Sequence, residues 1–251
     1  EDSIIREIER YTKLPGFKGT IHDLGGPTAN MYGYDCDAKR KRGACRNKRC
    51  LFPAVCPSLK VSHARQIALL ERARKVPGVK HVFVASGIRY DLIFADKEGE
   101  RYLEQIVRHH VSGQMKVAPE HTKSSILQLM GKPSKALLVR FKKLFDQLNA
   151  KTGKKQFLTY YFIAAHPGCT KEEMLSLSAF ARQELHVRPE QAQIFTPTPS
   201  TWSTLMYYTE KNPFTGEPLF VEKDNGRKDE QKRAIKEPLA AHGIYRKPGK
   251  K

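Results

Sequence analysis

Four cysteines stand close together in a stretch rich in basic and turn-forming residues. Their spacing is Cys36-x8-Cys45-x4-Cys50-x5-Cys56, so four of the chain's five cysteines fall in one short segment. Zinc ribbons use paired Cys-x2-Cys knuckles, which this spacing does not match. Iron–sulfur clusters tolerate irregular spacing of thiolate ligands. We therefore expect a metal site here and favour a [4Fe–4S] cluster over structural zinc. The alternative is four independent reduced cysteines in a basic surface loop.

Basic residues surround these thiols: Lys39, Arg40, Lys41, Arg42, Arg46, Lys48 and Arg49. Positive neighbours lower the pKa of a thiol and offset the negative charge of a four-thiolate site. Pro53 and Pro57 flank the last two cysteines and restrict the backbone, as a preorganised site needs. Cys169 is different, because it follows Pro167-Gly168 at an expected helix start. There a helix dipole lowers the pKa of a thiol, but we expect a small buried residue.

A double glycine lies just ahead of the cysteines. The segment Asp23-Leu-Gly-Gly-Pro-Thr28 ends a predicted strand over 18–24. Gly25 and Gly26 have no Cβ, so a ligand can come close to the backbone there. A ligand-approach turn at the carboxyl end of a strand, followed by a candidate metal loop, is typical of an active-site face.

Helices and strands alternate along the chain. Apolar periodicity predicts helices over 3–13, 61–73, 102–110, 126–130, 137–148 and from the capping box Thr170-Lys-Glu-Glu173 onward. Apolar β-forming runs predict strands over 18–24, 80–86, 114–118, 157–165 and 191–195. Such an order predicts right-handed parallel crossovers, with all strand ends gathered on one face. Five strands are too few to close an eight-stranded barrel. The alternation of helices and strands stops after residue 209. Residues 229–241 are compatible with one amphipathic helix, and the composition of residues 246–251 is typical of disorder.

Composition adds limits of its own. The chain has 251 residues and a formal net charge of +19, which favours polyanionic partners such as RNA. It has no run of about 18 apolar residues and no signal peptide, so we expect no membrane span. An odd number of cysteines without secretory signals suits a reducing, cytoplasmic setting. The start at Glu1-Asp2-Ser3, without Met, suggests a piece of a longer protein.

The strand-end segments, taken together, resemble the YgiQ family of radical S-adenosylmethionine (SAM) proteins. The resemblance covers roughly residues 1–210, and its last three segments are also loosely similar to radical-SAM methylthiotransferases. Five segments carry it: Leu24-Gly-Gly-Pro-Thr-Ala-Asn-Met-Tyr32, Ala85-Ser-Gly-Ile-Arg-Tyr-Asp91, Lys116-Val-Ala-Pro-Glu-His-Thr122, Phe162-Ile-Ala-Ala-His-Pro-Gly168 and Thr196-Pro-Thr-Pro-Ser200.

The resemblance implies a partial (β/α)6 radical-SAM-type barrel that lacks its first strand. Residues 1–209 would form it, with 33–58 as a cysteine-rich insertion and 210–251 as a basic, partly disordered C-terminal extension. The family's first strand is followed by a Cys-x3-Cys-x2-Cys loop that holds a [4Fe–4S] cluster and, through its open iron, SAM. This chain contains no such motif. We therefore expect SAM cleavage to a 5′-deoxyadenosyl radical only from a longer parent enzyme, and an inactive fragment here.

The resemblance also places individual residues around SAM. It implies that Gly25, Gly26, Pro27 and Thr28 lie by the methionine amino group, where Pro27 replaces the acid common in radical-SAM proteins. Backbone oxygens, Asp23 or Glu120 would then meet the ammonium. Residues implied to face the ribose and the methionine carboxylate are Ser86, Arg89, Lys116 and Glu120, and His166 is implied to lie near the adenine. Outward-facing charges and a hydrogen-bonded core histidine are the ordinary alternatives for Arg89, Lys116 and His166.

Two further functions stay open beside the radical-SAM enzyme. One is a metal-stabilised, basic nucleic-acid-binding module, in which Tyr32, Tyr34 and Phe52 stack bases. The other is a degenerate barrel with a scaffolding role. For the enzyme, the resemblance implies an electron donor such as flavodoxin or ferredoxin and an auxiliary [4Fe–4S] or zinc site at Cys36, Cys45, Cys50 and Cys56. The substrate, RNA or another polyanion among the candidates, is not defined by the sequence.

Overall fold

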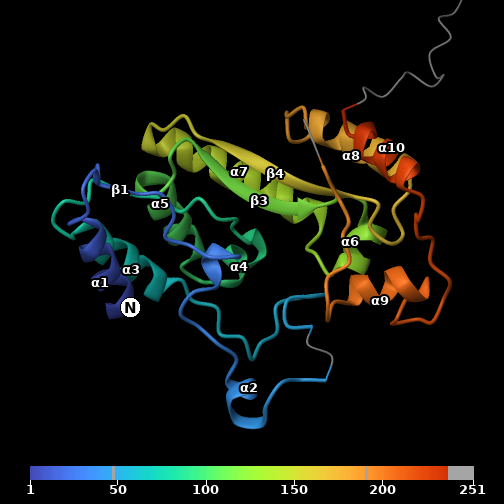
Figure 1. The fold of residues 1–251 in the computed structure, drawn as a ribbon, viewed down its shortest axis with the longest axis horizontal. Coiled ribbons are helices and arrows are strands. Elements are labelled where there is room, and N and C mark those ends of the chain that lie inside the picture. The colour runs from blue at the N-terminus through green and yellow to red at the C-terminus, as the bar shows by residue number, and fades with distance from the viewer. Residues whose placement is uncertain (47–48, 190–191, 237–251) are drawn as a thin grey trace, which may run out of the picture. The chain divides into compact units, whose positions relative to one another are not determined.

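The chain folds as a mixed α/β protein in this computed structural model, which describes residues 1–46, 49–189 and 192–236 (Figure 1). Its contacts divide it into two compact units. The first unit is Glu1–Pro119 with Gly131–Tyr161, and the second is Glu120–Met130 with the chain from Phe162 onward. The helix predicted over 229–241 falls partly outside the described residues, as does the end of the C-terminal extension.

The first unit contains most of the predicted helices. Its helices are α1 (Asp2–Tyr11), α2 (Asp37–Arg42), α3 (Ala64–Arg74), α4 (Tyr90–Ala95), α5 (Gly99–His109) and α7 (Lys135–Thr152), with a 3-10 turn at Ala29–Met31. In α7, Ser134 caps the first turn and Gly153 ends the helix in a left-handed conformation, φ 66°. Leu138, Phe141 and Phe145 on its inner side are fully buried. Figure 1 shows α7 running along two strands, β3 (Gln114–Glu120) and β4 (Phe157–Ala164).

Parallel pairing organises the strands. β1 (Thr20–Ile21) pairs with β2 (His81–Val82) in the register Thr20↔His81, and a parallel bridge joins Ile88 to Val117 of β3. The other sheet has the order β3–β4–β5, where β5 is Gln193–Ile194. The prediction of parallel α/β organisation is confirmed at this level. The described strands form small open sheets and not a closed barrel.

The pairing of β1 and β2 is shorter than the strands predicted over 18–24 and 80–86. Backbone hydrogen bonds continue just beyond the paired residues, from Phe83 N to the Ile21 carbonyl at 2.9 Å and from Leu24 N to the Phe83 carbonyl at 2.7 Å. After Phe83 the Asp23 carboxylate takes over, because its Oδ1 accepts hydrogen bonds from the Ala85 and Ser86 amides at 2.9 and 3.2 Å. A side chain has replaced the backbone ladder at this point. The Ala85 and Ser86 amides, which follow β2, therefore have hydrogen-bond acceptors without a longer strand.

The second unit is mainly helical. It contains α6 (Ser124–Met130), α8 (Lys171–Gln183), α9 (Trp202–Thr209) and α10 (Asn225–Ala234), together with β5. α10 packs against α8 and β5, where Ser178 Oγ donates to the Ile235 carbonyl at 2.8 Å. The capping box predicted at Thr170 and Glu173 is confirmed, with both reciprocal bonds present. Helices α2, α4 and α9 were not predicted; α2 and α4 have only six residues each, too few for a clear apolar period.

No helix among the described residues has both the length and the apolar character needed to cross a bilayer.

Candidate functional site

The turn after β1 lies against the segment after β2, within the first unit. Leu24 N donates to the Phe83 carbonyl at 2.7 Å, and Ala29 N donates to the Gly87 carbonyl at 2.9 Å. These two bonds bracket the turn Gly25-Gly26-Pro27-Thr28 on both sides. The two strand-end segments that the sequence assigned to one ligand are therefore neighbours in the fold.

The two glycines of this turn have different surroundings. A Cβ on Gly25 would lie 2.7 Å from Asp23 Oδ1 and 2.9 Å from Ser86 Oγ, so a side chain there has no room. A Cβ on Gly26 would meet no atom within 4 Å. Gly25 thus permits the close approach of the two segments, whereas Gly26 leaves the backbone open to a ligand.

Asp23 and Ser86 are already bonded to each other. Besides the two amides that Asp23 accepts, its other carboxylate oxygen accepts a hydrogen bond from Ser86 Oγ. The carboxylate therefore serves first to hold the Ser86 segment against the turn. Pro27 and Thr28 lie beside this pair, Pro27 exposed and Thr28 half-buried.

Arg89 also has a partner within the protein. Its Nε and Nη2 donate to the two carboxylate oxygens of Asp91 at 3.0 and 2.5 Å, in a bidentate pair. Asp91 is 7% exposed and Arg89 20% exposed, so the pair is mostly shielded from water. A guanidinium that is matched in this way is less available to a second carboxylate. Lys116, by contrast, is exposed on β3.

A buried polar network, which the sequence did not predict, lies behind the turn. Asn30 is fully buried and bonds to the backbone of Arg89 and to His63, and His63 bonds to Asp96. Burial lowers the pKa of His63, although Asp96 opposes this shift. Burial acts to raise the pKa of Asp96, but the Glu98 and His63 amides outweigh it, and the net shift is downward. Asn30 and His63 are 33 residues apart, so no local pattern connects them.

Glu120 and His166, the two remaining predicted ligand residues, belong to the second unit. Glu120 ends β3 with φ 64°, a left-handed conformation that is strained for a residue with a side chain. His166 is 2% exposed; its Nδ1 bonds to the Pro167 carbonyl and its Nε2 to Ser203 Oγ, both at 2.8 Å. Burial lowers the pKa of His166 to about 4, so the ring is neutral near pH 7.

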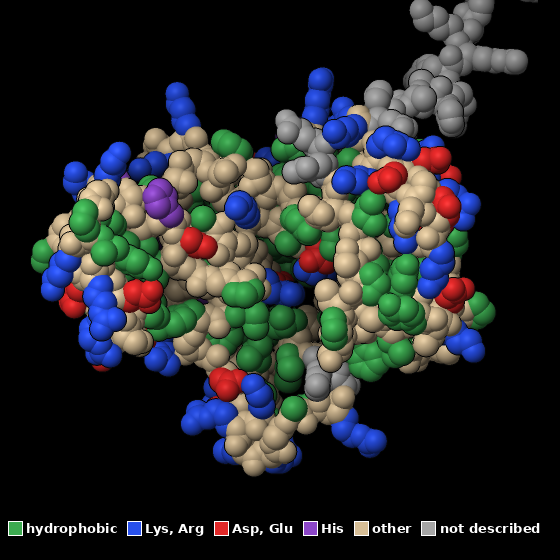
Figure 2. Space-filling model, in the orientation of Figure 1, with side chains coloured by type: hydrophobic (Ala, Val, Ile, Leu, Met, Phe, Trp, Pro, Cys, Tyr) green, Lys and Arg blue, Asp and Glu red, His purple; other side chains and the backbone are tan. Residues whose placement is uncertain are grey.

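The cysteine loop closes on a short stem. Cys36 forms an antiparallel bridge with Leu59, and Asp37 N donates to the Ser58 carbonyl at 3.3 Å. Within the loop, Cys56 N donates to the Cys50 carbonyl at 2.8 Å. Cys36 is buried and its Sγ caps α2, Cys56 is half-buried, and Cys45 and Cys50 are exposed. Figure 2 shows Lys and Arg side chains gathered around this part of the first unit.

The other three thiols of the loop act on Cys50. Burial raises the pKa of Cys50, and Cys36, Cys56 and Cys45 each raise it further, whereas Lys39 lowers it. The basic neighbour Lys39 therefore acts in the expected direction, but burial and the other three thiols outweigh it, and the net shift of the Cys50 pKa is upward. In the described part of the chain, no three His, Cys, Asp or Glu side chains are arranged to hold a metal ion. The donor set suits a thiolate-bound metal in kind, but the thiols would have to draw together around it.

Cys169 is a buried thiol, as expected. It has no exposed surface, and its Sγ lies 3.6 Å from His121 Nε2. Burial raises the pKa of Cys169 to about 12. A thiol in this state is not a nucleophile near pH 7.

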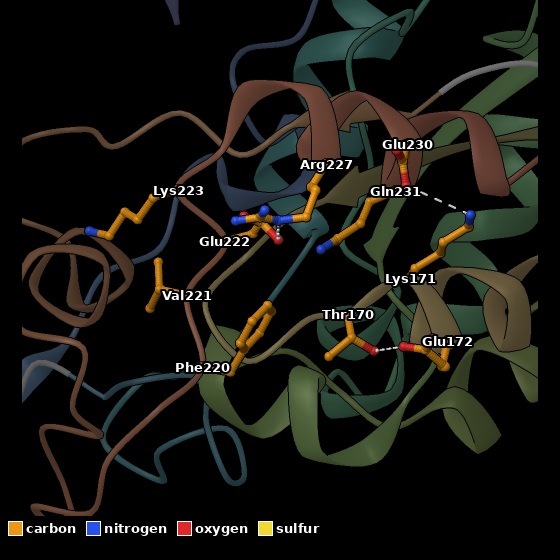
Figure 3. A pocket seen from close by; sticks show the side chains of 10 residues that line it. All are labelled: Thr170, Lys171, Glu172, Phe220, Val221, Glu222, Lys223, Arg227, Glu230 and Gln231. Carbon is orange, nitrogen blue, oxygen red and sulfur yellow. Dashed lines mark hydrogen bonds and ion pairs between the residues drawn. The ribbon is translucent and has the colours of Figure 1, made fainter.

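A separate open cavity of about 610 Å³ lies in the second unit, at the start of α8 and α10 (Figure 3). Its charged side chains pair with one another, Arg227 with Glu222 at 2.9 Å and Lys171 with Glu230 at 3.8 Å. None of the residues that the sequence singled out as ligands lines it. We assign no ligand to this cavity.

Comparison with known proteins gives relatives over almost the whole chain. A UPF0313 protein of Fusobacterium nucleatum is 56% identical over 238 residues, which is 94% of this chain and 42% of the relative. UPF0313 proteins of Methanocella arvoryzae and Clostridium perfringens are 50% and 44% identical over 89% and 98% of this chain. The chain spans only 37% of each of these two relatives. No protein-family model matches the chain. The names of the relatives state no activity.

Proposed function

We propose that the chain is the C-terminal part of a radical SAM iron–sulfur enzyme, and that its strand-end turns form one side of the SAM site. The observation that carries the proposal is the junction of two turns. Gly25 fits against Asp23 and Ser86 with no room for a Cβ, while Gly26 stays open. The likeness of five strand-end segments to YgiQ-type radical SAM proteins supports the same assignment. The parallel strands would then be part of a partial (β/α)6 barrel.

In this proposal the chain binds and orients SAM. The open backbone at Gly26 and Pro27 offers carbonyl oxygens to the methionine ammonium, whereas the Thr28 carbonyl already accepts from Met31 N at 3.2 Å. The exposed Lys116 is the better partner for the carboxylate, since Asp91 already holds Arg89. A [4Fe–4S] cluster, held in a longer parent enzyme by ligands outside this chain, would supply the electron for the cleavage of SAM. The residues of this chain would hold the methionine end of SAM in place for that step.

We further propose that Cys36, Cys45, Cys50 and Cys56 bind an auxiliary metal centre, a [4Fe–4S] cluster in preference to zinc. The closed stem of the loop and the effect of Cys36, Cys45 and Cys56 on Cys50 support a common site. Mutual repulsion among four thiolates disfavours the empty, ionised site, and a bound cation relieves that repulsion. Metal binding would therefore order the loop.

SAM turnover tests the proposal in the longer Fusobacterium nucleatum relative. The relative, reconstituted with iron and sulfide, is reduced in the presence of SAM, and 5′-deoxyadenosine is measured by liquid chromatography. We expect 5′-deoxyadenosine to form, and we expect replacement of the residue aligned with Lys116 by alanine to raise the KM for SAM about tenfold or more. If the reconstituted relative releases no 5′-deoxyadenosine when it is reduced with SAM present, the assignment as a radical SAM enzyme is wrong.

The competing function is a basic nucleic-acid-binding module. Its support comes from α2, which carries Lys39, Arg40, Lys41 and Arg42, and from Arg49, whose guanidinium lies 4.7 Å from the centre of the Phe52 ring. This function predicts binding to single-stranded RNA that weakens steeply with salt and needs no SAM. Fluorescence anisotropy of a labelled RNA oligonucleotide at two salt concentrations tests this function. Binding without SAM that weakens steeply at the higher salt concentration would favour the nucleic-acid-binding module over the enzyme.

A further inference from the structure

The side chain of Asn30 binds both backbone groups of one residue, Arg89, in the neighbouring strand-end segment. Its Oδ1 accepts from Arg89 N at 2.8 Å, and its Nδ2 donates to the Arg89 carbonyl at 2.9 Å. Asn30 is fully buried, so water does not compete for these bonds. A side-chain amide that meets both groups of one residue replaces the pairing that a neighbouring strand would have given.

The orientation of this amide is itself fixed. The second Nδ2 hydrogen faces His63 Nε2 at 3.2 Å, and His63 Nδ1 lies 2.7 Å from Asp96 Oδ2. Since Asp96 accepts, His63 carries its hydrogen on Nδ1 and leaves Nε2 as the acceptor for Asn30. The ring also stacks on Tyr102, with centroids 4.1 Å apart. The amide cannot turn over without losing bonds on both sides.

The neighbouring backbone is held just as closely. The Ala29 carbonyl accepts from Gln66 Nε2 at 2.8 Å, and Gln66 Oε1 accepts from the Tyr102 hydroxyl at 3.1 Å. The Asn30 carbonyl accepts from the Tyr34 hydroxyl at 3.0 Å. The segment just after the glycine turn is thereby anchored to α3 and α5.

A purely structural role would be the ordinary interpretation of such a network. Stability alone does not need it, because an apolar core of the same shape is often as stable as a buried polar one. What a polar clamp adds is a defined distance between two particular backbone segments. Asn30 sets this distance. It lies two residues after Thr28 in one segment, and it bonds to the backbone of Arg89, three residues after Ser86 in the other segment.

We propose that Asn30 is the positioning residue of the candidate SAM site, and that it holds the Gly25–Thr28 turn and the Ser86–Arg89 segment in the one arrangement that accepts the methionine end of the ligand. This inference rests on the proposed function. His63 and Asp96 act through Asn30, since they fix the direction of its amide. The clamp makes the turn rigid before any ligand arrives.

Hydrogen exchange of single amides, measured by NMR on this chain, tests the inference with Asn30→Ala. The reporters are Ala29 N and Ser86 N, which bond to Gly87 and Asp23 and not to Asn30. The matched control is Asn149→Ala, which removes another buried asparagine of the first unit that bonds to the Phe145 carbonyl and the Gln156 amide. Urea unfolding of both variants corrects for the general loss of stability.

We expect the reporter amides to exchange about tenfold faster or more in Asn30→Ala than in Asn149→Ala after that correction. Equal corrected rates would overturn the inference, whatever happens to ligand binding. If the alanine variant does not fold, Asn30→Ser is measured in the same way, because its hydroxyl can meet only one of the two Arg89 groups.

Equilibrium dialysis of radiolabelled SAM against the same proteins gives the second readout. Where the unaltered chain binds SAM, we expect Asn30→Ala to weaken binding about tenfold or more and Asn149→Ala to leave it unchanged. Equal weakening in both variants would refute the positioning role. Absence of binding by the unaltered chain would show that SAM needs the cluster of the longer protein, and the exchange rates alone would then decide whether Asn30 orders the turn.

Discussion

At the scale of single residues, the two adjacent glycines have opposite tolerance to a methyl group. We expect Gly25→Ala to lower the free energy of unfolding by about 1–3 kcal/mol, because its Cβ would displace the bonded Asp23 and Ser86 side chains. Gly26→Ala meets open space and is expected to be neutral or to stabilise by up to about 1 kcal/mol. Urea unfolding of both variants measures the difference. A loss of equal size in both would show that the contacts around Gly25 are not decisive.

Residue types in the sequence indicate what a side chain is able to do, but not which partner it already has. The double glycine predicted a place where a ligand can approach the backbone, but at Gly25 the side chains of Asp23 and Ser86 occupy that space, and only Gly26 leaves it open. Arg89 looked like a free cation for a carboxylate, yet Asp91 binds it through two hydrogen bonds. That pair depends on how the chain turns into α4, which local patterns do not define. Asn30, His63 and Asp96 were missed because their contacts join segments far apart in the sequence.

At the scale of elements, the start of α8 depends on its capping box. Thr170 and Glu173 satisfy backbone groups reciprocally, and Thr170 N donates to Glu173 Oε2 at 3.0 Å. We expect Thr170→Ala to destabilise the protein by about 1 kcal/mol. Glu173→Gln keeps an acceptor at the same place and is expected to cost less. Thermal unfolding of the two variants tests this order, and the reverse order would contradict it.

The cysteine loop is the element whose proposed metal is most directly measurable. On the chain purified without oxygen, we expect about four irons and four sulfides per molecule, both lost in Cys45→Ala. Cys169→Ser is the control, since Cys169 is buried in the second unit and is not a proposed ligand. One zinc per molecule without sulfide would instead identify the loop as a structural zinc site. Finding neither metal would refute a four-cysteine metal site.

The pattern of elements was largely predictable, whereas their lengths were not. Long amphipathic segments such as α5 and α7 were identified because their apolar faces are wide and regular. The strand pairing of β1 and β2 is shorter than its apolar runs, and beyond it the Asp23 side chain binds the Ala85 and Ser86 amides in place of a backbone carbonyl. Such substitution of a side chain for a backbone partner leaves no periodic trace in the sequence.

At the scale of the whole molecule, buried histidines make stability depend on pH. Burial lowers the pKa of His110, His121 and His166 to about 4 each. The unfolded chain binds protons at these rings near pH 6.5, and the folded chain only near pH 4. The free energy of unfolding therefore falls as pH drops through this window, by up to about 1.4 kcal/mol per pH unit for each ring.

Urea unfolding at pH 7, 6 and 5 measures this slope. We expect His121→Gln to make the slope of the unfolding free energy against pH shallower, because one of the three buried rings is removed. His81→Gln replaces an exposed ring and is expected to leave the slope unchanged. The lowered pKa values of Asp96 and Glu222 remove their stabilisation only at lower pH, so they do not account for the loss above pH 5. A flat curve between pH 7 and 5 would contradict the prediction.

The stem of the cysteine loop has a consequence for how the chain can evolve. Its two ends meet at Cys36↔Leu59 and at the bond from Asp37 to Ser58, so the β1–α3 connection is closed before the loop begins. Lengthening a loop whose ends are already joined costs little, about 0.6 kcal/mol for each doubling. The loop can therefore be replaced as a unit without changing its stem. Related chains can exchange it for segments of other length or metal preference and keep the same glycine turn beside it.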